Sequence, residues 1–207
     1  DYNRPIYEDH LLPLGRLREN WHQVERADMV VVTKCPENMS PLDYRLISSG
    51  LNPDQATVSL NPRPYQSLHF STVSYGGLLP VYPDDNPYNV YLGNLTSKDT
   101  VLLLTGIANP RGFVRHFRNY PFKVVVCHYP DHHDFTRKDV QDILRKFESL
   151  SGERKIIITT EKDAVRLAYN PYVALKQRTF YLPIAVKMLD TADRPGFIVD
   201  LRKRIRQ

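Results

Sequence analysis

Short apolar runs alternate with polar, helix-prone stretches through the second half of the chain. Three of these runs have the length and the aliphatic composition of buried strands, at residues 101–105, 122–127 and 155–160. Each run is followed by residues that typically start a helix. This alternation predicts an α/β fold with a parallel sheet and right-handed crossover connections.

Capping residues mark the starts of the intervening helices. Asn109 precedes Pro110, and proline is favoured as a first helical residue because its missing N–H is not needed there. Thr136 and Asp139 have the spacing of a capping box, and an apolar helical face follows them. That face comprises Val140, Ile143, Leu144 and Phe147.

The other elements of this half follow from weaker signals. Gly152 is expected to close the helix, a further helix spans 163–168, and 178–183 form a last strand. A terminal helix is expected over 193–206, with cations in its final turn, where the helix dipole favours them. Its apolar stripe comprises Phe197, Leu201 and Ile205.

The first half of the chain is less regular. The run MVVV at 29–32 predicts a buried strand. Prolines recur from residue 36 to residue 87, and alternating polar and apolar positions at 68–75 predict one or two short strands. This part is therefore interpreted as a stranded connector between two bodies.

Composition limits the class of protein. The 207 residues suffice for one or two domains with a real core. No apolar run approaches the roughly 18 residues of a membrane span. The chain has no leader pattern and begins at Asp1, so a start within a longer polypeptide is expected.

Charge and cysteine content limit the class of protein and its binding partners only a little. Cys35 and Cys127 are far apart and lack a CxxC partner, which argues against a disulfide framework or a thiolate zinc site and fits a reducing compartment. A formal charge of +5 permits a nucleotide, phospholipid or nucleic acid as partner, and does not choose among them.

Polar residues follow each predicted strand of the second half. Ligands of open parallel sheets bind beyond the carboxyl ends of the strands, where the strand-to-helix turns emerge. The reactive side chains are therefore expected at one edge of the sheet. They are Asn109 after the first strand, His128, Asp131, His132 and His133 after the second, and Glu161, Lys162 and Asp163 after the third.

The segment HYPDHH, residues 128–133, is the densest of these groups. A histidine beside a carboxylate suits general acid/base chemistry. The same residues could instead bind a divalent metal, although their spacing matches no standard zinc pattern, or form a hydrogen-bonded structural loop. All three interpretations stay open on the residues alone.

Three further segments could contact phosphate. Lys162 could serve as a counter-charge oriented by Glu161 or Asp163, while Asp163 could equally cap the following helix. Arg18 and Glu19 lie in a glycine-containing loop, and Thr33 and Lys34 end a predicted strand. Each is also an ordinary surface feature.

Known nucleotide and hydrolase motifs are missing from the sequence. None of the nine glycines begins a GxxxxGK[ST] loop or a GxGxxG turn, and neither GxSxG nor HExxH occurs. The 207 residues therefore contain no recognised triphosphate cradle.

Six segments taken in order carry a family resemblance. They are LLPLGRLRE (11–19), RADMVVVTK (26–34), LTGIANP (104–110), YPDHHDF (129–135), TTEKDAVRL (159–167) and YLPI (181–184). Together they resemble the C-terminal part of the tetraacyldisaccharide 4'-kinases, the lipid A kinases of Gram-negative bacteria. The segments extend over nearly the whole chain, and the combination of PDHHDF with TEKDAV is specific.

The resemblance implies a fold and an activity. It implies transfer of the γ-phosphate of ATP, with Mg²⁺, to the 4'-hydroxyl of a disaccharide lipid at the cytoplasmic face of the inner membrane. It also implies that residues 1–34 are the tail of a P-loop kinase domain, 35–98 a stranded linker, and 99–207 a three-layer, Rossmann-like domain. Neither nucleic acid nor an obligate protein partner is expected.

The resemblance also assigns site residues. Asp131 and His132 match the family's DH pair, which contributes to catalysis, its histidine cooperating with an N-terminal aspartate to activate the sugar hydroxyl. Arg18 and Glu19 match the family's nucleotide and metal side. The P-loop, its lysine and the acidic magnesium ligands have no counterpart here, and Arg16 stands where the family often has proline. The chain alone is therefore expected to be inactive.

Two rival functions are kept from the residues themselves. A metal-dependent phosphoesterase would use His128, Asp131, His132 and His133. A lipid-surface binding module would use the basic end of the terminal helix. That basic end comprises Arg202, Lys203, Arg204 and Arg206.

Overall fold

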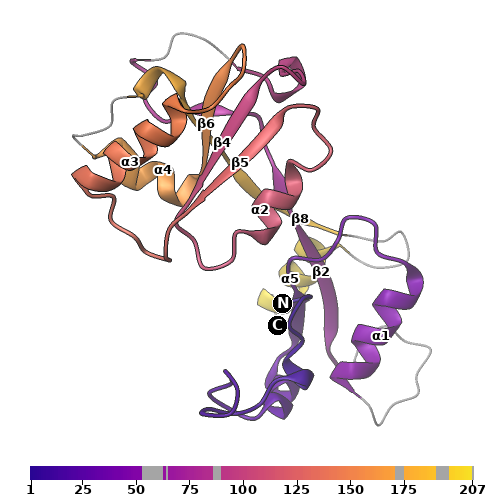
Figure 1. Cartoon of the computed structure of the whole chain (residues 1–207). Coiled ribbons are helices and arrows are strands. Elements are labelled where there is room, and N and C mark those ends of the chain that lie inside the picture. The colour runs from indigo at the N-terminus through magenta and orange to yellow at the C-terminus, as the bar shows by residue number, and fades with distance from the viewer. Residues whose placement is uncertain (53–62, 64, 86–89, 171–174, 190–195, 207) are drawn as a thin grey trace. The chain divides into compact units, whose positions relative to one another are not determined.

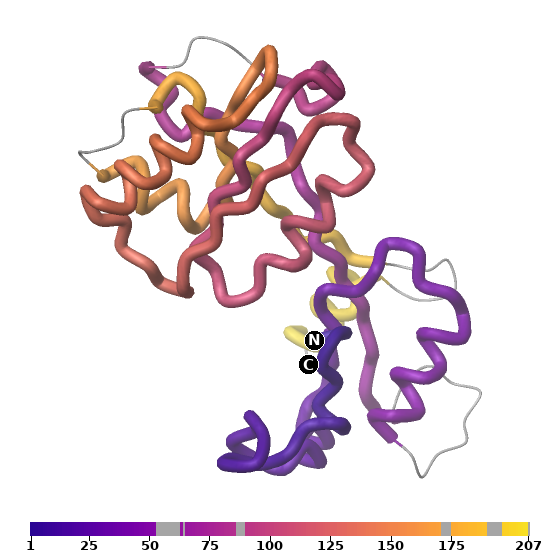
Figure 2. The backbone as a smooth tube through the Cα atoms, viewed as in Figure 1, coloured from indigo at the N-terminus to yellow at the C-terminus, as the bar shows by residue number. Residues whose placement is uncertain are grey.

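The chain forms two compact units, each described here by itself. The computed structural model describes residues 1–52, 63, 65–85, 90–170, 175–189 and 196–206. Unit 1 comprises Asp1–Ser74 and Ala185–Gln207, and unit 2 comprises Tyr75–Ile184 (Figure 1). The chain therefore leaves unit 1 once and returns once, as the tube in Figure 2 shows. The boundaries between the two units fall at different residues from the predicted domain boundaries. The predicted domains stay a prediction.

Unit 2 is built on a five-stranded sheet with the order β3-β7-β6-β4-β5. Four of its strands are parallel, and β3 is antiparallel to β7. The predicted α/β fold with a parallel sheet is confirmed, with strand ends within one residue of those expected. The strands are β3 (Leu79–Pro80), β4 (Thr100–Thr105), β5 (Lys123–His128), β6 (Lys155–Thr160) and β7 (Thr179–Leu182).

Helices pack against both sides of this sheet (Figure 1). Successive side chains of a strand point to opposite faces. Leu102 and Leu104 of β4 therefore pack with the helices α3 and α4, whereas Val101 and Leu103 pack with α2. The helices of the unit are α2 (Arg111–His116), α3 (Arg137–Glu148), α4 (Glu161–Ala168), and the 3₁₀ turns η3 (Leu92–Asn94) and η4 (Lys176–Arg178).

Local capping signals locate the helix starts. The capping box of Thr136 and Asp139 at the start of α3 is confirmed. The prediction that Asn109 caps a helix starting at Pro110 is wrong by one residue: α2 begins at Arg111 with Pro110 as its N-cap. The Asn109 side chain still accepts a hydrogen bond from the Arg111 amide at 3.2 Å. The expectation that Asp163 caps α4 is wrong: Thr160 is the N-cap, and its hydroxyl accepts the Asp163 amide, because α4 begins at Glu161.

A buried carboxylate holds the amino ends of β4 and β6. The Asp99 side chain is 2% exposed and forms an ion pair with Arg154 at 2.7 Å. It also accepts hydrogen bonds from Thr96, through the amide at 2.7 Å and the hydroxyl at 3.2 Å. The hydrogen bonds from Arg154 lower the pKa of Asp99 to about 2, with Thr96 contributing. Asp99 is therefore a charged anchor at the edge of the sheet opposite the candidate site.

Unit 1 contains a three-stranded sheet with the order β1-β2-β8. The predicted strand at 29–32 is confirmed as β1, which is parallel to β2. Burial along β2 does not alternate, because Leu68 to Thr72 are buried without interruption. The elements are β1 (Met29–Val32), β2 (Ser67–Tyr75), β8 (Ile184–Met188), α1 (Pro41–Leu51), α5 (Phe197–Ile205), η1 (Ile6–Glu8) and η2 (Trp21–Arg26).

Helix α1 lies in the region for which the sequence predicts a connector with strands, so that prediction is wrong for residues 41–51. Its signal is nevertheless local: Ser40 and Asp43 form a capping box, and Pro41 occupies the first helical turn. Ile47 and Leu51 of this helix join the core of unit 1 with Leu68 and Phe70 of β2.

Helix α5 differs from its prediction in two respects. It begins at Phe197, and the predicted residues 193–195 lie outside the described residues. Ile205 is 76% exposed, so it does not join the expected apolar stripe. The helix is fixed instead by buried Asp200, whose carboxylate lies 3.0 Å from Nε2 of His69. Among the described residues, no helix has both the length and the apolar character needed to cross a membrane.

Candidate functional site

The carboxyl ends of β4, β5 and β6 lie side by side in unit 2. Thr105 of β4 pairs with His128 of β5, and Leu104 of β4 pairs with Thr159 of β6. The chain continues from β4 into α2 on one face of the sheet and from β6 into α4 on the other. Neighbouring strands that depart to opposite faces define the position where open α/β sheets bind ligands.

Buried Asp163 joins two of these strand ends. It has no exposed surface, and its Oδ2 accepts the Gly106 amide at 2.8 Å and the Thr160 hydroxyl at 2.7 Å. A Cβ at Gly106 would lie 3.0 Å from Asp163 Oδ1, so a larger residue would press on the carboxylate. Asp163 therefore fixes the turn after β4 against the start of α4, and it does not contact Lys162 as the sequence suggested.

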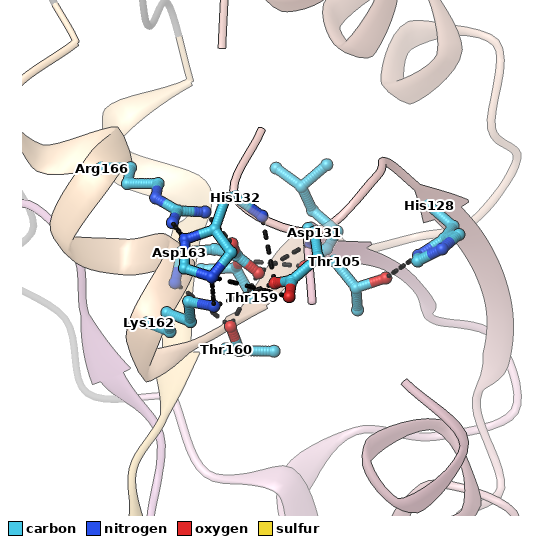
Figure 3. Close-up of polar contacts among 11 residues, drawn as sticks. Thr105, His128, Asp131, His132, Thr159, Thr160, Lys162, Asp163 and Arg166 are labelled. Carbon is cyan, nitrogen blue, oxygen red and sulfur yellow. Dashed lines mark hydrogen bonds and ion pairs between the residues drawn. The ribbon is translucent and has the colours of Figure 1, made fainter. Parts of the chain in front are cut away.

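Asp131, His132 and Lys162 lie close together where the loop after β5 meets the start of α4 (Figure 3). Lys162 Nζ lies 2.9 Å from Asp131 Oδ1 and 3.3 Å from His132 Nε2. The hydrogen bond from Lys162 is the main cause of a lowered pKa of Asp131, with the neighbouring His132 contributing. Asp131 is therefore ionised at neutral pH, and it lies beside an imidazole whose side chain is 72% exposed.

His132 has a backbone conformation that is unusual for a residue with a side chain. Its φ is +60°, in the left-handed region, and its amide donates to Asp131 Oδ1 at 3.0 Å. Strained backbone of this kind is concentrated at functional sites. The conformation presents the imidazole to solvent and to helix α4.

Arg166 is the member of this cluster that the sequence did not reveal. Its Nη2 lies 3.1 Å from His132 Nδ1, so the imidazole lies between Lys162 and Arg166 (Figure 3). The two cations are four residues apart on α4 and therefore share one face of the helix. That spacing was visible in the sequence, but the contact depends on where the loop after β5 lies.

The other two histidines of HYPDHH have separate partners. His128 Nδ1 lies 3.0 Å from the Thr105 hydroxyl. His133 Nε2 lies 3.0 Å from Asp139 Oδ2, and its ring stacks on Tyr129. In the described part of the chain, no three His, Cys, Asp or Glu side chains form a group that could hold a metal ion. The metal-dependent phosphoesterase is therefore not supported.

Asn109 and Glu161 also have local partners. The Asn109 side chain accepts from Arg111, as described above. Glu161 Oε2 accepts the amide of Ile184 at 3.1 Å and so joins the start of α4 to the chain after β7. The structure thus brings together Asp131, His132 and Lys162, but gives Asn109 and Glu161 roles in helix and strand connections.

The remaining candidates lie in unit 1. Glu19 forms an ion pair with Arg26 at 3.1 Å, and Lys34, whose φ is +59°, forms one with Asp1 at 2.6 Å. The Thr33 carbonyl accepts the Tyr2 amide at 2.8 Å. Arg18 is exposed on the same loop as Glu19. The charged groups of Glu19 and Lys34 are therefore already paired within unit 1.

A polar pocket of about 390 Å³ lies beside this loop. Its lining comes from residues 3–9 and 14–16 and includes Arg4, Asp9 and Arg16. Asp9 Oδ1 accepts the Arg16 amide at 3.2 Å, and backbone hydrogen bonds, foremost that from His10, lower the pKa of Asp9. The loop that contains Arg18 and Glu19 therefore has a defined conformation within unit 1.

These features define an α/β protein with a cluster of charged side chains and a histidine at the carboxyl edge of a parallel sheet. The chain belongs to the tetraacyldisaccharide-1-P 4'-kinase family (LpxK), whose model matches residues 1–206.

Proteins named tetraacyldisaccharide 4'-kinase are the relatives. That of Bacteroides thetaiotaomicron is 41% identical over 197 residues, covering 91% of this chain and 49% of the relative. That of Parabacteroides distasonis is 36% identical over 209 residues, covering 100% of this chain and 52% of the relative. The chain therefore spans about half the length of the curated relatives it matches.

A solved structure has a similar fold. The crystal structure of LpxK from Aquifex aeolicus in complex with ATP matches with a TM-score of 0.51 and 20% identity. The match covers 96% of this chain and 49% of the solved chain. At this level of identity, the likeness concerns the fold alone.

Proposed function

We propose that this protein is the part of a tetraacyldisaccharide 4'-kinase that contains the catalytic histidine, His132. The reaction would transfer the γ-phosphate of ATP to the 4'-hydroxyl of a tetraacyldisaccharide 1-phosphate during lipid A biosynthesis. The family model and the names of the relatives support the activity. The observation that carries the assignment to this site is the exposed pair of Asp131 and His132 at the carboxyl edge of the sheet. His132 of this pair has a strained backbone with a positive φ.

His132 would act as the base in this reaction. Phosphoryl transfer depends mainly on positioning and on charge stabilisation, and little covalent chemistry is left to the protein. The imidazole would accept the proton of the sugar hydroxyl, and ionised Asp131 would stabilise the imidazolium that forms. Lys162 would hold Asp131 in place through its 2.9 Å contact.

ATP and Mg²⁺ fit the residues of this chain only in part. Arg18, Glu19, Thr33 and Lys34 could lie near the phosphates or the metal, but Glu19 and Lys34 are in ion pairs. The described residues contain no group of ligands for a metal, and the 207 residues contain no glycine-rich phosphate loop. We therefore propose that ATP and Mg²⁺ are held mainly by parts of the family protein that these residues do not represent.

The domain assignment follows the same proposal. Residues 1–34 would be the tail of a P-loop kinase domain, 35–98 a stranded linker, and 99–207 a Rossmann-like domain with three layers. The parallel order of β4 to β7 supports the last of these. The protein would work at the cytoplasmic face of the inner membrane as a peripheral protein that binds the lipid A precursor.

A chimeric kinase tests the proposed function. The segment of the Bacteroides thetaiotaomicron kinase that aligns with this chain would be replaced by this chain, so that the relative supplies the other half. Transfer of phosphate from ATP to tetraacyldisaccharide 1-phosphate is expected from the chimera, and none from the 207-residue chain alone. A folded chimera without transfer would count against the function.

Helix α5 could bring the protein to the lipid surface. Its exposed side carries both aliphatic side chains and cations, a combination that binds anionic membranes. Arg204 is excluded from the predicted basic cluster, because it contacts the Tyr65 carbonyl at 3.1 Å and lies 3.6 Å from Asp200. The exposed residues are Ile198, Val199, Arg202, Lys203, Ile205 and Arg206.

Neutralising the three exposed cations at the carboxyl end of α5, of which Arg206 is the C-cap, is expected to weaken binding to anionic vesicles. Each cation near such a surface contributes about 1 kcal/mol, so replacing Arg202, Lys203 and Arg206 by glutamine should reduce binding on the order of 100-fold. Co-sedimentation with phosphatidylglycerol vesicles measures this. The matched control replaces Arg111, Arg115 and Arg118, which are exposed cations of unit 2. An equal loss in the control would show that only net charge matters.

A further inference from the structure

His132 lies between two cations that come from one helix. Its Nδ1 lies 3.1 Å from Arg166 Nη2, and its Nε2 lies 3.3 Å from Lys162 Nζ (Figure 3). Neither an ammonium nor a guanidinium group can accept a hydrogen bond. The two contacts therefore compete for the lone pair of the imidazole, since a neutral ring has only one nitrogen without a proton.

The surroundings decide which nitrogen keeps its proton. A proton on Nδ1 would point at Arg166, a group that only donates, and this arrangement is unfavourable. A proton on Nε2 instead has a carboxylate nearby, since Asp131 Oδ2 lies 3.6 Å from that nitrogen, next to Lys162 Nζ at 3.3 Å. Lys162 has a better acceptor in Asp131 Oδ1 at 2.9 Å. The consistent arrangement has Nε2 protonated and the lone pair of Nδ1 directed at Arg166.

Arg166 is itself held by a buried group. Its Nη1 lies 3.6 Å from Oδ1 of Asp163, which has no exposed surface. The other carboxylate oxygen of Asp163 is already engaged by Gly106 and Thr160. The Arg166 side chain is only 22% exposed. Its Nη1 faces Asp163, and its Nη2 contacts His132. The core of unit 2 therefore determines where the donor to His132 lies.

We propose that Arg166 is a positioning residue that keeps the proton of His132 on Nε2 and leaves Nδ1 as the basic atom. This inference rests on the proposed function only where it concerns the reaction. There, a substrate hydroxyl would replace Arg166 at Nδ1. Its O–H bond breaks as Nδ1–H forms, and the oxygen's electron pair forms the new P–O bond while the bond to the departing nucleoside diphosphate breaks.

The tautomer of His132 can be measured directly in the protein. Long-range ¹H–¹⁵N NMR spectra distinguish a protonated from an unprotonated ring nitrogen, and the His132→Gln variant assigns the signals. At a pH where the ring is neutral, we expect a protonated Nε2 and an unprotonated Nδ1. Arg166→Met is expected to give a mixture of the two tautomers. Arg115→Met, which removes an exposed arginine of α2, is expected to leave the spectrum unchanged.

Two results would overturn the role of Arg166. One is a protonated Nδ1 in the unmodified protein, and the other is an unchanged tautomer in Arg166→Met. If the methionine variant does not fold, Arg166→Lys decides the question, because it keeps a positive charge beside Asp163 but lacks the planar fork. A mixture of tautomers is expected in the lysine variant, and a pure Nε2–H form would contradict the proposal.

The chimeric kinase gives a second readout. Arg166→Met is expected to lower kcat in proportion to the fraction of His132 that loses the Nε2–H tautomer, and to leave KM for the lipid unchanged. A rise in KM alone would make Arg166 a binding residue and contradict the positioning role. If the unmodified chimera were inactive, the proposed function would fail, whereas the NMR comparison would still decide the tautomer.

Discussion

Replacing His132 by alanine in the chimeric kinase is expected to lower kcat by about 10²- to 10⁴-fold, the range of a general acid/base group. The imidazole is 72% exposed and packs little against the protein, so its loss should not disturb the fold. Steady-state phosphate transfer to the lipid, measured at saturating ATP, gives the comparison. Turnover equal to that of the unmodified chimera would remove His132 from the mechanism.

The matched control is the last residue of β5, directly before the loop. His128 is also exposed, but its Nδ1 lies 3.0 Å from the Thr105 hydroxyl and it has no part in the proposed chemistry. His128→Ala is therefore expected to keep kcat near the value of the unmodified chimera. A large loss in this variant as well would mean that the integrity of the end of β5 and the following loop, and not the base at position 132, sets the rate.

Replacing Asp99 by alanine is expected to lower the free energy of unfolding at neutral pH by about 2–3 kcal/mol. The change removes a buried carboxylate that accepts from Thr96 and Arg154, and it leaves the Thr96 amide without its partner. Arg154 is half exposed and can regain water, which keeps the loss at the lower end for a broken ion pair. Urea denaturation followed by circular dichroism measures it.

The same variant should change the pH dependence of stability. The pKa of Asp99 falls from an ordinary 3.8 to about 2 in the folded protein. Its contribution is therefore complete above pH 3.8 and is lost as the pH falls toward 2. Asp99→Ala should flatten the decline in this window, whereas Asp84→Asn, at an exposed position, should leave it unchanged. Equal slopes in all three proteins would contradict the anchor role.

The strands of unit 2 could be predicted from sequence because their signals are local. Apolar runs such as 155–160 are too short for helices, and Thr136 with Asp139 marks a helix start within four residues. Helix α1 has an equally local capping box at Ser40, but the surrounding prolines favoured a connector. The recurrent prolines thus predict a connector in a region where the capping box correctly predicts a helix.

The candidate site was predictable only in part. Topology places Asp131, His132 and Lys162 at one edge, because the carboxyl ends of parallel strands coincide. The role of Arg166 depends on the positive φ of His132 and on the burial of Asp163, and neither can be derived from spacing. Sequence patterns therefore predict that Asp131, His132 and Lys162 lie at one edge, whereas the contact between Arg166 and His132 is visible only in the structure.

The position of unit 2 in the chain has a consequence for how such a protein can change over evolution. The strands β2 and β8, which lead into and out of it, are neighbours in one sheet, and the Ser74 hydroxyl lies 3.3 Å from the Ala185 carbonyl. Unit 2 is thus an insertion whose two ends meet. A short turn from Ser74 to Ala185 would close the gap that removal of unit 2 leaves. The part that contains His132 can therefore be replaced or lost without a change in the path of the remaining chain.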